Sequence, residues 1–128
     1  MKSKRNLVLI PINLKPTPDK YEIHVAHKIA EYFQTDVQFI RAQPNVKTAD
    51  LRIKDQLWEV KSPQGSSRRT IENIIRKASH QADNIIIDLS RVKMRQDVAV
   101  RRIKYVLVKT KRIHRTVILT KGGRVFEI

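Results

Sequence analysis

The sequence contains no cysteine among its 128 residues. Disulfide bonds and metal sites built on thiolates are therefore excluded, and any metal would have to be bound by carboxylate or imidazole groups. The lack of cysteine is also compatible with a site of action in the reducing environment of the cytoplasm.

Long apolar runs are also absent, so we expect no membrane-spanning segment. Near the N-terminus, Leu7 to Ile12 form a short apolar run that contains Pro11 and has no small-residue cleavage site behind it. This pattern indicates a strand rather than a signal peptide. Repeats, linkers and low-complexity segments are missing too. With 41% apolar residues, the chain suits one domain, residues 1–128, around one core.

Acidic residues are scarce. The 12 Asp and Glu residues against 27 Lys and Arg give a net charge of +15 at pH 7. A field of this size favours a polyanionic partner. Nucleic acid is the first candidate, and an acidic membrane surface or an acidic protein follows.

The hydrophobic pattern predicts an α/β (α+β) fold, with a mixed central β-sheet flanked by helices. Alternation and short apolar runs predict strands at residues 7–12, 37–40, 49–53, 57–61, 84–89, 116–119 and 124–128. A period near 3.6 predicts helices at residues 20–34, about 71–82 and 96–109. The run at 84–89 is apolar almost throughout, as expected for a strand covered on both faces.

A hairpin over residues 50–61 gathers the charged groups on which our functional hypothesis depends. If Lys54 and Asp55 form its turn, Asp50 lies directly opposite Glu59. Strand alternation then directs Asp50, Glu59 and Lys61 to one face. The opposite face is apolar and is expected to join the core through Leu51, Ile53, Trp58 and Val60.

Two carboxylates opposed in this way have Cβ atoms about 4.5–5.5 Å apart and repel each other unless something compensates. A divalent cation between Asp50 and Glu59 would compensate, and oxygen ligands suit Mg²⁺ or Mn²⁺. The main-chain carbonyl of Val60 is a candidate for a further ligand. Lys61 is placed to orient or deprotonate an attacking water, or to stabilise charge on a phosphate. The alternative is a solvated hairpin without chemistry.

The helix that precedes this hairpin offers two acids, Glu22 and Glu31. Glu22 falls on the apolar stripe with Ala26, Ile29 and Phe33, whereas Glu31 lies on the polar side. Because a carboxylate turned toward the core is costly unless it is paired or binds metal, Glu22 is the candidate for a third acid and metal ligand. A first-turn Glu favoured only by the helix dipole is the alternative.

The combination of Asp50 with Glu59-Val60-Lys61, between a helix that carries an acid and a second helix, resembles the PD-(D/E)xK nuclease superfamily. A longer set of residues is similar to the C-terminal tRNA-nuclease domains of contact-dependent growth inhibition toxins. It spans roughly Tyr21 to Leu89 and includes Leu57-Trp58-Glu59-Val60-Lys61-Ser62-Pro63 and Ile85-Ile86-Ile87-Asp88-Leu89.

This resemblance implies a restriction-endonuclease-like fold and metal-dependent hydrolysis of RNA, with tRNA favoured, by Glu22, Asp50, Glu59 and Lys61. It also implies delivery into target cells as part of a larger toxin, and an acidic immunity protein as a partner. Metal-dependent hydrolysis does not need the ribose 2′-hydroxyl, so a DNA endonuclease of a mobile element is an alternative. A non-enzymatic basic protein that binds nucleic acid is another.

Phosphate contacts are expected along the helix that follows the hairpin. Hydroxyl groups, backbone N–H groups and cations can grip a phosphate at a helix start. The candidates are Ser66, Ser67, Arg68, Arg69, Arg76 and Lys77. Helix capping by the serines and simple solvation of the cations are the alternatives. The four histidines lack metal-binding spacing, and we interpret them as surface residues: His24, His27, His80 and His114.

Overall fold

The structure, a computed structural model, describes residues 6–15, 17–41 and 48–128. Its elements follow one another in the predicted order. They are β1 (Val8–Leu9), α1 (Lys20–Phe33), β2 (Val37–Phe39), β3 (Leu51–Ile53), β4 (Gln56–Lys61), α2 (Arg68–Ala78), β5 (Asn84–Asp88), α3 (Gln96–Lys109), β6 (Arg115–Leu119) and β7 (Val125–Glu127).

The seven strands form one mixed sheet in the order β1-β2-β3-β4-β5-β6-β7. The pairs β1–β2, β4–β5 and β5–β6 are parallel, and the others are antiparallel. The ends of β2, β4, β5 and β6 and the start of β3 therefore lie at the same edge of the sheet. This edge carries the candidate site described below.

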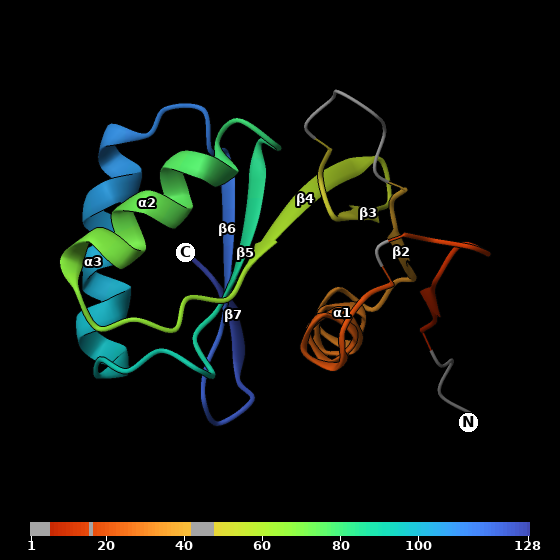
Figure 1. Cartoon of the computed structure of the whole chain (residues 1–128), viewed down its shortest axis with the longest axis horizontal. Helices are drawn as coiled ribbons and strands as arrows, with labels where there is room; N and C mark the ends of the chain where they lie inside the picture. The colour runs from red at the N-terminus through yellow and green to blue at the C-terminus, as the bar shows by residue number, and fades with distance from the viewer. Residues whose placement is uncertain (1–5, 16, 42–47) are drawn as a thin grey trace.

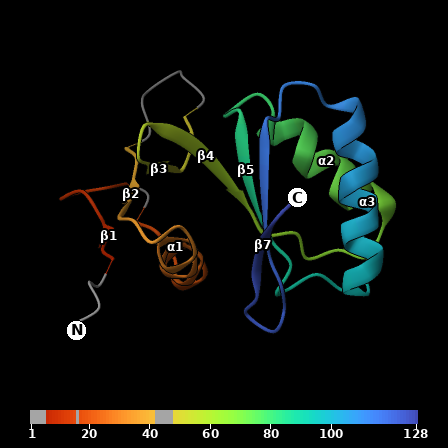
Figure 2. The ribbon, with the colours of Figure 1, turned by 180° about the vertical axis from the view of Figure 1, so that it is seen from behind.

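The sheet is curled around α1 and leaves α2 and α3 on its other side (Figure 1). Helix α1 contacts β1, β2 and β7, so it lies between the two halves of the sheet. Helices α2 and α3 pack against each other beside β5 and β6, as the view from behind also shows (Figure 2). The predicted α/β class with a mixed central sheet between helices is confirmed.

Strand β5 separates two apolar clusters and is buried throughout. Ile86 joins the cluster under α1, together with Trp58 and Leu51. Ile85 and Ile87 join the cluster under α2 and α3. The prediction of a strand covered on both faces is confirmed, and the rigid β5 fixes the position of its neighbour β4.

Several predicted elements end earlier in the structure, and two of these ends have a local cause. Strand β1 covers only Val8–Leu9, because Pro11 cannot donate to a ladder and its carbonyl accepts from Leu14 in a turn. Helix α2 ends at Ala78, where the hydroxyl of Ser79 donates to the carbonyl of Arg76 at 2.7 Å. No helix among the described residues is long and apolar enough to cross a membrane.

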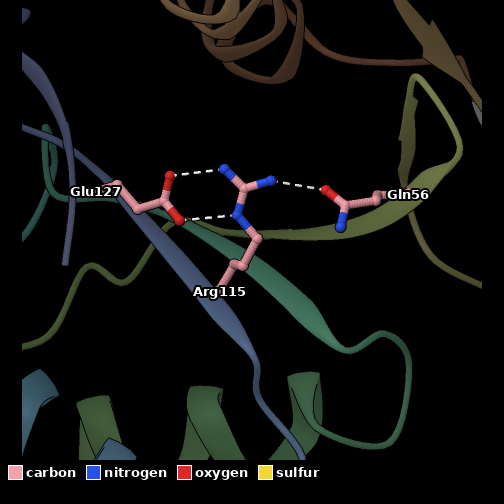
Figure 3. Close-up of polar contacts among 3 residues, drawn as sticks. All are labelled: Gln56, Arg115 and Glu127. Carbon is pink, nitrogen blue, oxygen red and sulfur yellow. Dashed lines mark hydrogen bonds and ion pairs between the residues drawn. The ribbon is translucent and has the colours of Figure 1, made fainter.

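The strand ends opposite the candidate site are held by Arg115 at the start of β6. Its guanidinium donates two bonds to Glu127 of β7, at 2.7 and 2.8 Å, and one to Gln56 of β4 at 2.7 Å (Figure 3). The same group lies 5.2 Å from the ring centre of Trp58 and 5.4 Å from that of Phe33. Arg115 thus ties three strands to α1.

Candidate active site

The hairpin of β3 and β4 has the predicted turn, and its register is as predicted from the turn to the pair of Leu51 and Trp58. Lys54 adopts a left-handed conformation with φ 55°, and Ile53 pairs with Gln56. Leu51 pairs with Trp58, and both are buried in the cluster under α1. Because side chains alternate along β4, Glu59 and Lys61 point to the other face of the sheet.

The sequence predicts that Asp50 pairs with Glu59 in the ladder, and this prediction is wrong. The register ends at Leu51, and the N–H of Asp50 donates to the carbonyl of Trp58 at 3.1 Å. The Asp50 carboxylate instead accepts from the N–H of Val60 at 2.9 Å. This bond replaces the missing ladder pair and holds the carboxylate at the end of β4, so the two acids still meet.

Glu59 is the most buried of the predicted site residues, with 2% of its surface exposed. Lys61 lies 3.1 Å from one of its carboxylate oxygens, Oε2. No donor among the described residues faces the other oxygen, Oε1, which is buried. A buried carboxylate oxygen without a donor is costly, so the pair with Asp50 needs a shared proton or a cation.

Burial raises the pKa of Glu59 to about 8, from an ordinary value of 4.5. That value of the pKa already includes the negative charge of Asp50 and its hydrogen-bonding contact with Glu59, which act in the same direction as burial, and Lys61, which acts in the opposite direction. A carboxyl group that titrates this close to neutrality is typical of functional sites, although structural ion pairs produce such shifts as well.

Glu22 lies beside Asp50, whereas Glu31 is exposed on the far side of α1. One carboxylate oxygen of Glu22 accepts from the N–H of Asp19 at 3.2 Å in a capping box. Burial raises the pKa of Glu22, and the nearby charge of Asp50 adds to this. Glu22 thus belongs to the capping box of α1, and it also contributes a second partly buried acid to the same small cavity of about 90 Å³.

The donor set suits a divalent cation that keeps several waters. Among the described residues, no group of three or more His, Asp or Glu side chains could hold a metal by itself. Mg²⁺ commonly binds one or two carboxylates together with substrate phosphates, so Asp50 and Glu59 are the residues that would hold such an ion. The orphaned Oε1 of Glu59 supplies the free oxygen, and Glu22 and the carbonyl of Val60 are additional candidates.

No role was predicted from the sequence for Asp88 and Ser62, two polar residues next to Lys61. Asp88 ends β5 and is 1% exposed; one of its oxygens accepts from the hydroxyl of Ser62 at 3.2 Å and the other from the N–H of Ser90 at 2.9 Å. Since Lys61 pairs with Ile87 in parallel register, Asp88 lies one position beyond it. A single acid at the end of an apolar run was the available signal.

The six residues predicted to bind phosphate lie at the start of α2 and on its outer face. All six are exposed, and none forms an ion pair with a described residue. The four cations lie on α2, whereas Ser66 and Ser67 precede its first residue. Ser67 occupies the N-cap position without a side-chain cap bond, and its hydroxyl lies 3.3 Å from that of Thr70. Capping therefore does not use this hydroxyl. The four histidines are exposed, which confirms them as surface residues.

The fold and this cluster define a small, strongly basic α+β domain with a buried acidic pair and a lysine at one edge of its sheet. The sequence profile of the contact-dependent growth inhibition CdiA C-terminal domain family matches residues 47–125, which is more than half of the chain. The chain belongs to this family.

A solved structure described as "CdiA-CT/CdiI toxin and immunity complex from Burkholderia pseudomallei" contains a chain with a similar fold. The TM-score is 0.70, the sequence identity is 20%, and the match covers 96% of this chain and 98% of the other. At this identity the likeness concerns the fold. A search of curated proteins found no match.

Proposed function

We propose that this chain is a metal-dependent endonuclease that hydrolyses phosphodiester bonds of RNA and acts as the toxin domain of a larger contact-dependent growth inhibition protein. tRNA is the favoured substrate, because the hairpin and the residues after it resemble tRNA-nuclease domains of such toxins. The proposal places the chain on a PD-(D/E)xK scaffold, with Mg²⁺ or Mn²⁺ as its cofactor.

The observation that carries the proposal is the buried contact of Glu59 with Asp50 and Lys61. Lys61 lies 3.1 Å from Glu59, and the other oxygen of Glu59 has no donor among the described residues. An arrangement of this kind lowers the stability of the protein, so a role in solubility or folding does not explain it. A functional role at this edge of the sheet explains the arrangement.

In the proposed mechanism, Asp50 and Glu59 would hold the cation, and Glu22 and the carbonyl of Val60 would be auxiliary ligands. When bound, the cation would supply positive charge at the phosphate and acidify the attacking water. The ammonium group of Lys61 orients that water or neutralises the charge that develops on the phosphate. Asp88 and Ser62 fix the ends of β5 and β4, and thereby limit the movement of Lys61.

Substrate binding is assigned to the basic surface of α2. Arg68 and Arg69 follow the loop from Lys61, and Arg76 and Lys77 lie about two turns further along the helix. Their cations are exposed and unpaired among the described residues, so they are available to phosphates. Backbone contacts of this type give affinity without sequence information.

The proposed biological context has an immunity protein as a partner. The structurally similar chain comes from a toxin and immunity complex, and the family is one of contact-dependent growth inhibition. Because this chain carries a net charge of +15, an acidic partner would complement it. The cytoplasm of a target cell is the proposed site of action.

The test is to incubate the purified protein with total tRNA and with plasmid DNA, each with Mg²⁺ or with EDTA. We expect cleavage of tRNA with Mg²⁺ only, and loss of at least about a hundredfold in rate for Lys61→Ala. Lys54→Ala is the matched control, since Lys54 is an exposed lysine at the turn of the same hairpin. It should cleave like the wild type.

Two outcomes would replace the proposal. Cleavage of plasmid but not tRNA would identify a DNA endonuclease on the same scaffold. Binding of either nucleic acid without cleavage, with Lys61→Ala indistinguishable from the wild type, would identify a non-enzymatic binding protein.

A further inference from the structure

Arg91 is a half-buried arginine in the loop that follows β5, and it has an unusual environment. Its guanidinium carbon lies 4.0 Å from the centre of the Tyr21 ring at the start of α1. Lys20 reaches the same ring, with its ammonium nitrogen 5.2 Å from the ring centre. Two cations therefore share one aromatic ring, although like charges repel.

The Nε–H of Arg91 is buried and has no acceptor among the described residues. Arg91 also forms no ion pair with an acid in the described part of the chain. A buried donor of a charged group costs free energy when it is left without an acceptor. The structure thus holds a guanidinium in place through its stacking on Tyr21, and leaves the hydrogen-bonding edge unused.

The neighbours of Arg91 belong to the candidate active site. Tyr21 directly precedes Glu22, and Glu22 lines a cavity with Asp50. On the other side, Asp88 begins the loop that contains Arg91 and accepts from Ser62, the residue after Lys61. The loop is also tied to the one after β4, because the N–H of Lys93 donates to the carbonyl of Gly65 at 3.1 Å.

These contacts close a ring of residues around one edge of the sheet. It passes from Arg91 and Tyr21 through the acids Glu22, Asp50 and Glu59 to Lys61, Ser62 and Asp88, and returns along the chain to Arg91. Arg91 is therefore linked to the acidic cluster on two sides, through the ring of Tyr21 and through the chain that leads back to Asp88.

We infer that Arg91 binds a phosphate of the nucleic acid substrate and is held ready for it by the Tyr21 ring. This inference rests on the proposed function, which it extends by one substrate-binding residue. The planar guanidinium can offer two N–H groups in a fixed fork to two oxygens of one phosphate, which the ammonium of a lysine cannot do. A phosphate supplies the negative charge that Arg91 lacks among the described residues.

A structural role alone accounts less well for these observations. Arginines that only stabilise a fold normally pair with a carboxylate or a carbonyl, as Arg115 does with Glu127 and Gln56. Arg91 has no such acceptor among the described residues, while its ring partner is 39% exposed and faces solvent at the rim. An anionic ligand from outside fits this arrangement.

The first arm of the test measures binding without cleavage. A fluorescently labelled tRNA is titrated with the protein in EDTA at several salt concentrations. For Arg91→Ala we expect weaker binding and a slope of log K against log salt that is smaller by about 0.7–0.9, which corresponds to one phosphate contact. Arg91→Lys should keep the slope of the wild type, because the positive charge is kept. It should still bind tRNA more weakly, because the planar pair of N–H donors is lost.

The matched control is Arg95→Ala. Arg95 lies in the same loop, but its side chain is 81% exposed and pairs with Asp97 at 3.0 Å. We expect its salt slope to be that of the wild type. If Arg91→Ala and Arg95→Ala change the slope equally, or neither changes it, the assignment of a phosphate contact to Arg91 is wrong.

The second arm measures cleavage with Mg²⁺, after circular dichroism has shown that the variants are folded. Arg91→Ala should lower kcat/KM by about ten- to a hundredfold, and Arg91→Lys by less. Tyr21→Phe should retain activity, because the ring remains. If the wild type cleaves and Arg91→Ala stays within twofold of it, only this inference fails. If the wild type does not cleave, the proposed function fails and the binding arm alone decides on Arg91.

Discussion

Glu59 is destabilising as a carboxylate, and this makes its protonation visible in the stability of the protein. Its pKa is about 8 in the folded chain and near 4.5 when unfolded, so the folded state binds more protons between these values. By linkage, the contribution of Glu59 to stability without metal is most favourable below pH 4.5 and is lost as the pH rises toward 8. Burial of the charge causes this loss.

We therefore predict that Glu59→Gln stabilises the metal-free protein at pH 8 and abolishes cleavage. The amide has a similar shape but no charge to desolvate, so the decline in stability between pH 5 and pH 8 should largely disappear. Thermal unfolding in EDTA across this pH range measures the decline in stability of the wild type and of the variant. The idea fails if the wild type and the variant show the same pH dependence. Asp55→Asn, at the exposed turn, is the control for removal of one negative charge.

At the residue scale, the sequence predicted which acids and which lysine lie close together better than it predicted their local geometry. The two-residue turn and the alternation of the hairpin brought Glu59 and Lys61 to one face, and these follow from period and turn length. The predicted direct pairing of Asp50 with Glu59 was wrong, because the ladder ends at Leu51. The side chain of Asp50 accepts from the N–H of Val60 instead. Such a departure from the ladder depends on β2 beside it, where the N–H of Ile40 donates to the carbonyl of Asp50.

Among the elements, α1 combines a structural and a chemical task at its first turn. Its start is fixed by Asp19, which accepts from the N–H of Glu22 at 2.8 Å, and this capping box holds the Glu22 side chain at the rim of the cavity. The amphipathic period was sufficient to predict this helix and to separate Glu22 from Glu31. The bounds of α3 also follow from the sequence, whereas the early end of α2 depends on a local side-chain bond.

We predict that Glu22→Gln lowers cleavage with little loss of stability. Glutamine can keep the bond to the N–H of Asp19, so the cap survives, but the negative charge beside Asp50 is lost. The rate with subsaturating Mg²⁺ should fall by about tenfold, and more Mg²⁺ should recover part of it. Glu31→Gln on the exposed side of the same helix is the control. Equal rates for the two variants would remove Glu22 from the site.

At the scale of the whole molecule, the two ends of the sheet differ in composition. One end holds the acids and Lys61 with incomplete hydrogen bonding, and the other holds Arg115 with every partner in place. The strand order and the curl around α1 bring these groups together from residues far apart in sequence. Neither could be predicted from periodicity, which assigns faces to each element but not neighbours. For the same reason the position of Asp88 beside Lys61 could not be predicted.

This division predicts that stability and catalysis can be changed separately. Arg115→Met keeps the stem that packs on Trp58 and Phe33 but removes the ion pair with Glu127, so it should lower the free energy of unfolding by about 1 kcal/mol. Cleavage per folded molecule should be unchanged, because the site is at the other edge of the sheet. Chemical denaturation and initial rates on tRNA measure the two quantities.

The pH dependence and a double-mutant cycle identify the ion pair as the cause. The bond from Arg115 lowers the pKa of Glu127, so the pair stabilises the fold at pH values above 4.5 and its contribution is lost as the pH falls through the lowered pKa. The difference between wild type and Arg115→Met should therefore shrink in acid. In Glu127→Gln, the further cost of Arg115→Met should be smaller than in the wild type. Full additivity would show that the two side chains stabilise the protein independently. A fall in the cleavage rate of folded Arg115→Met would mean that the two ends of the sheet are coupled.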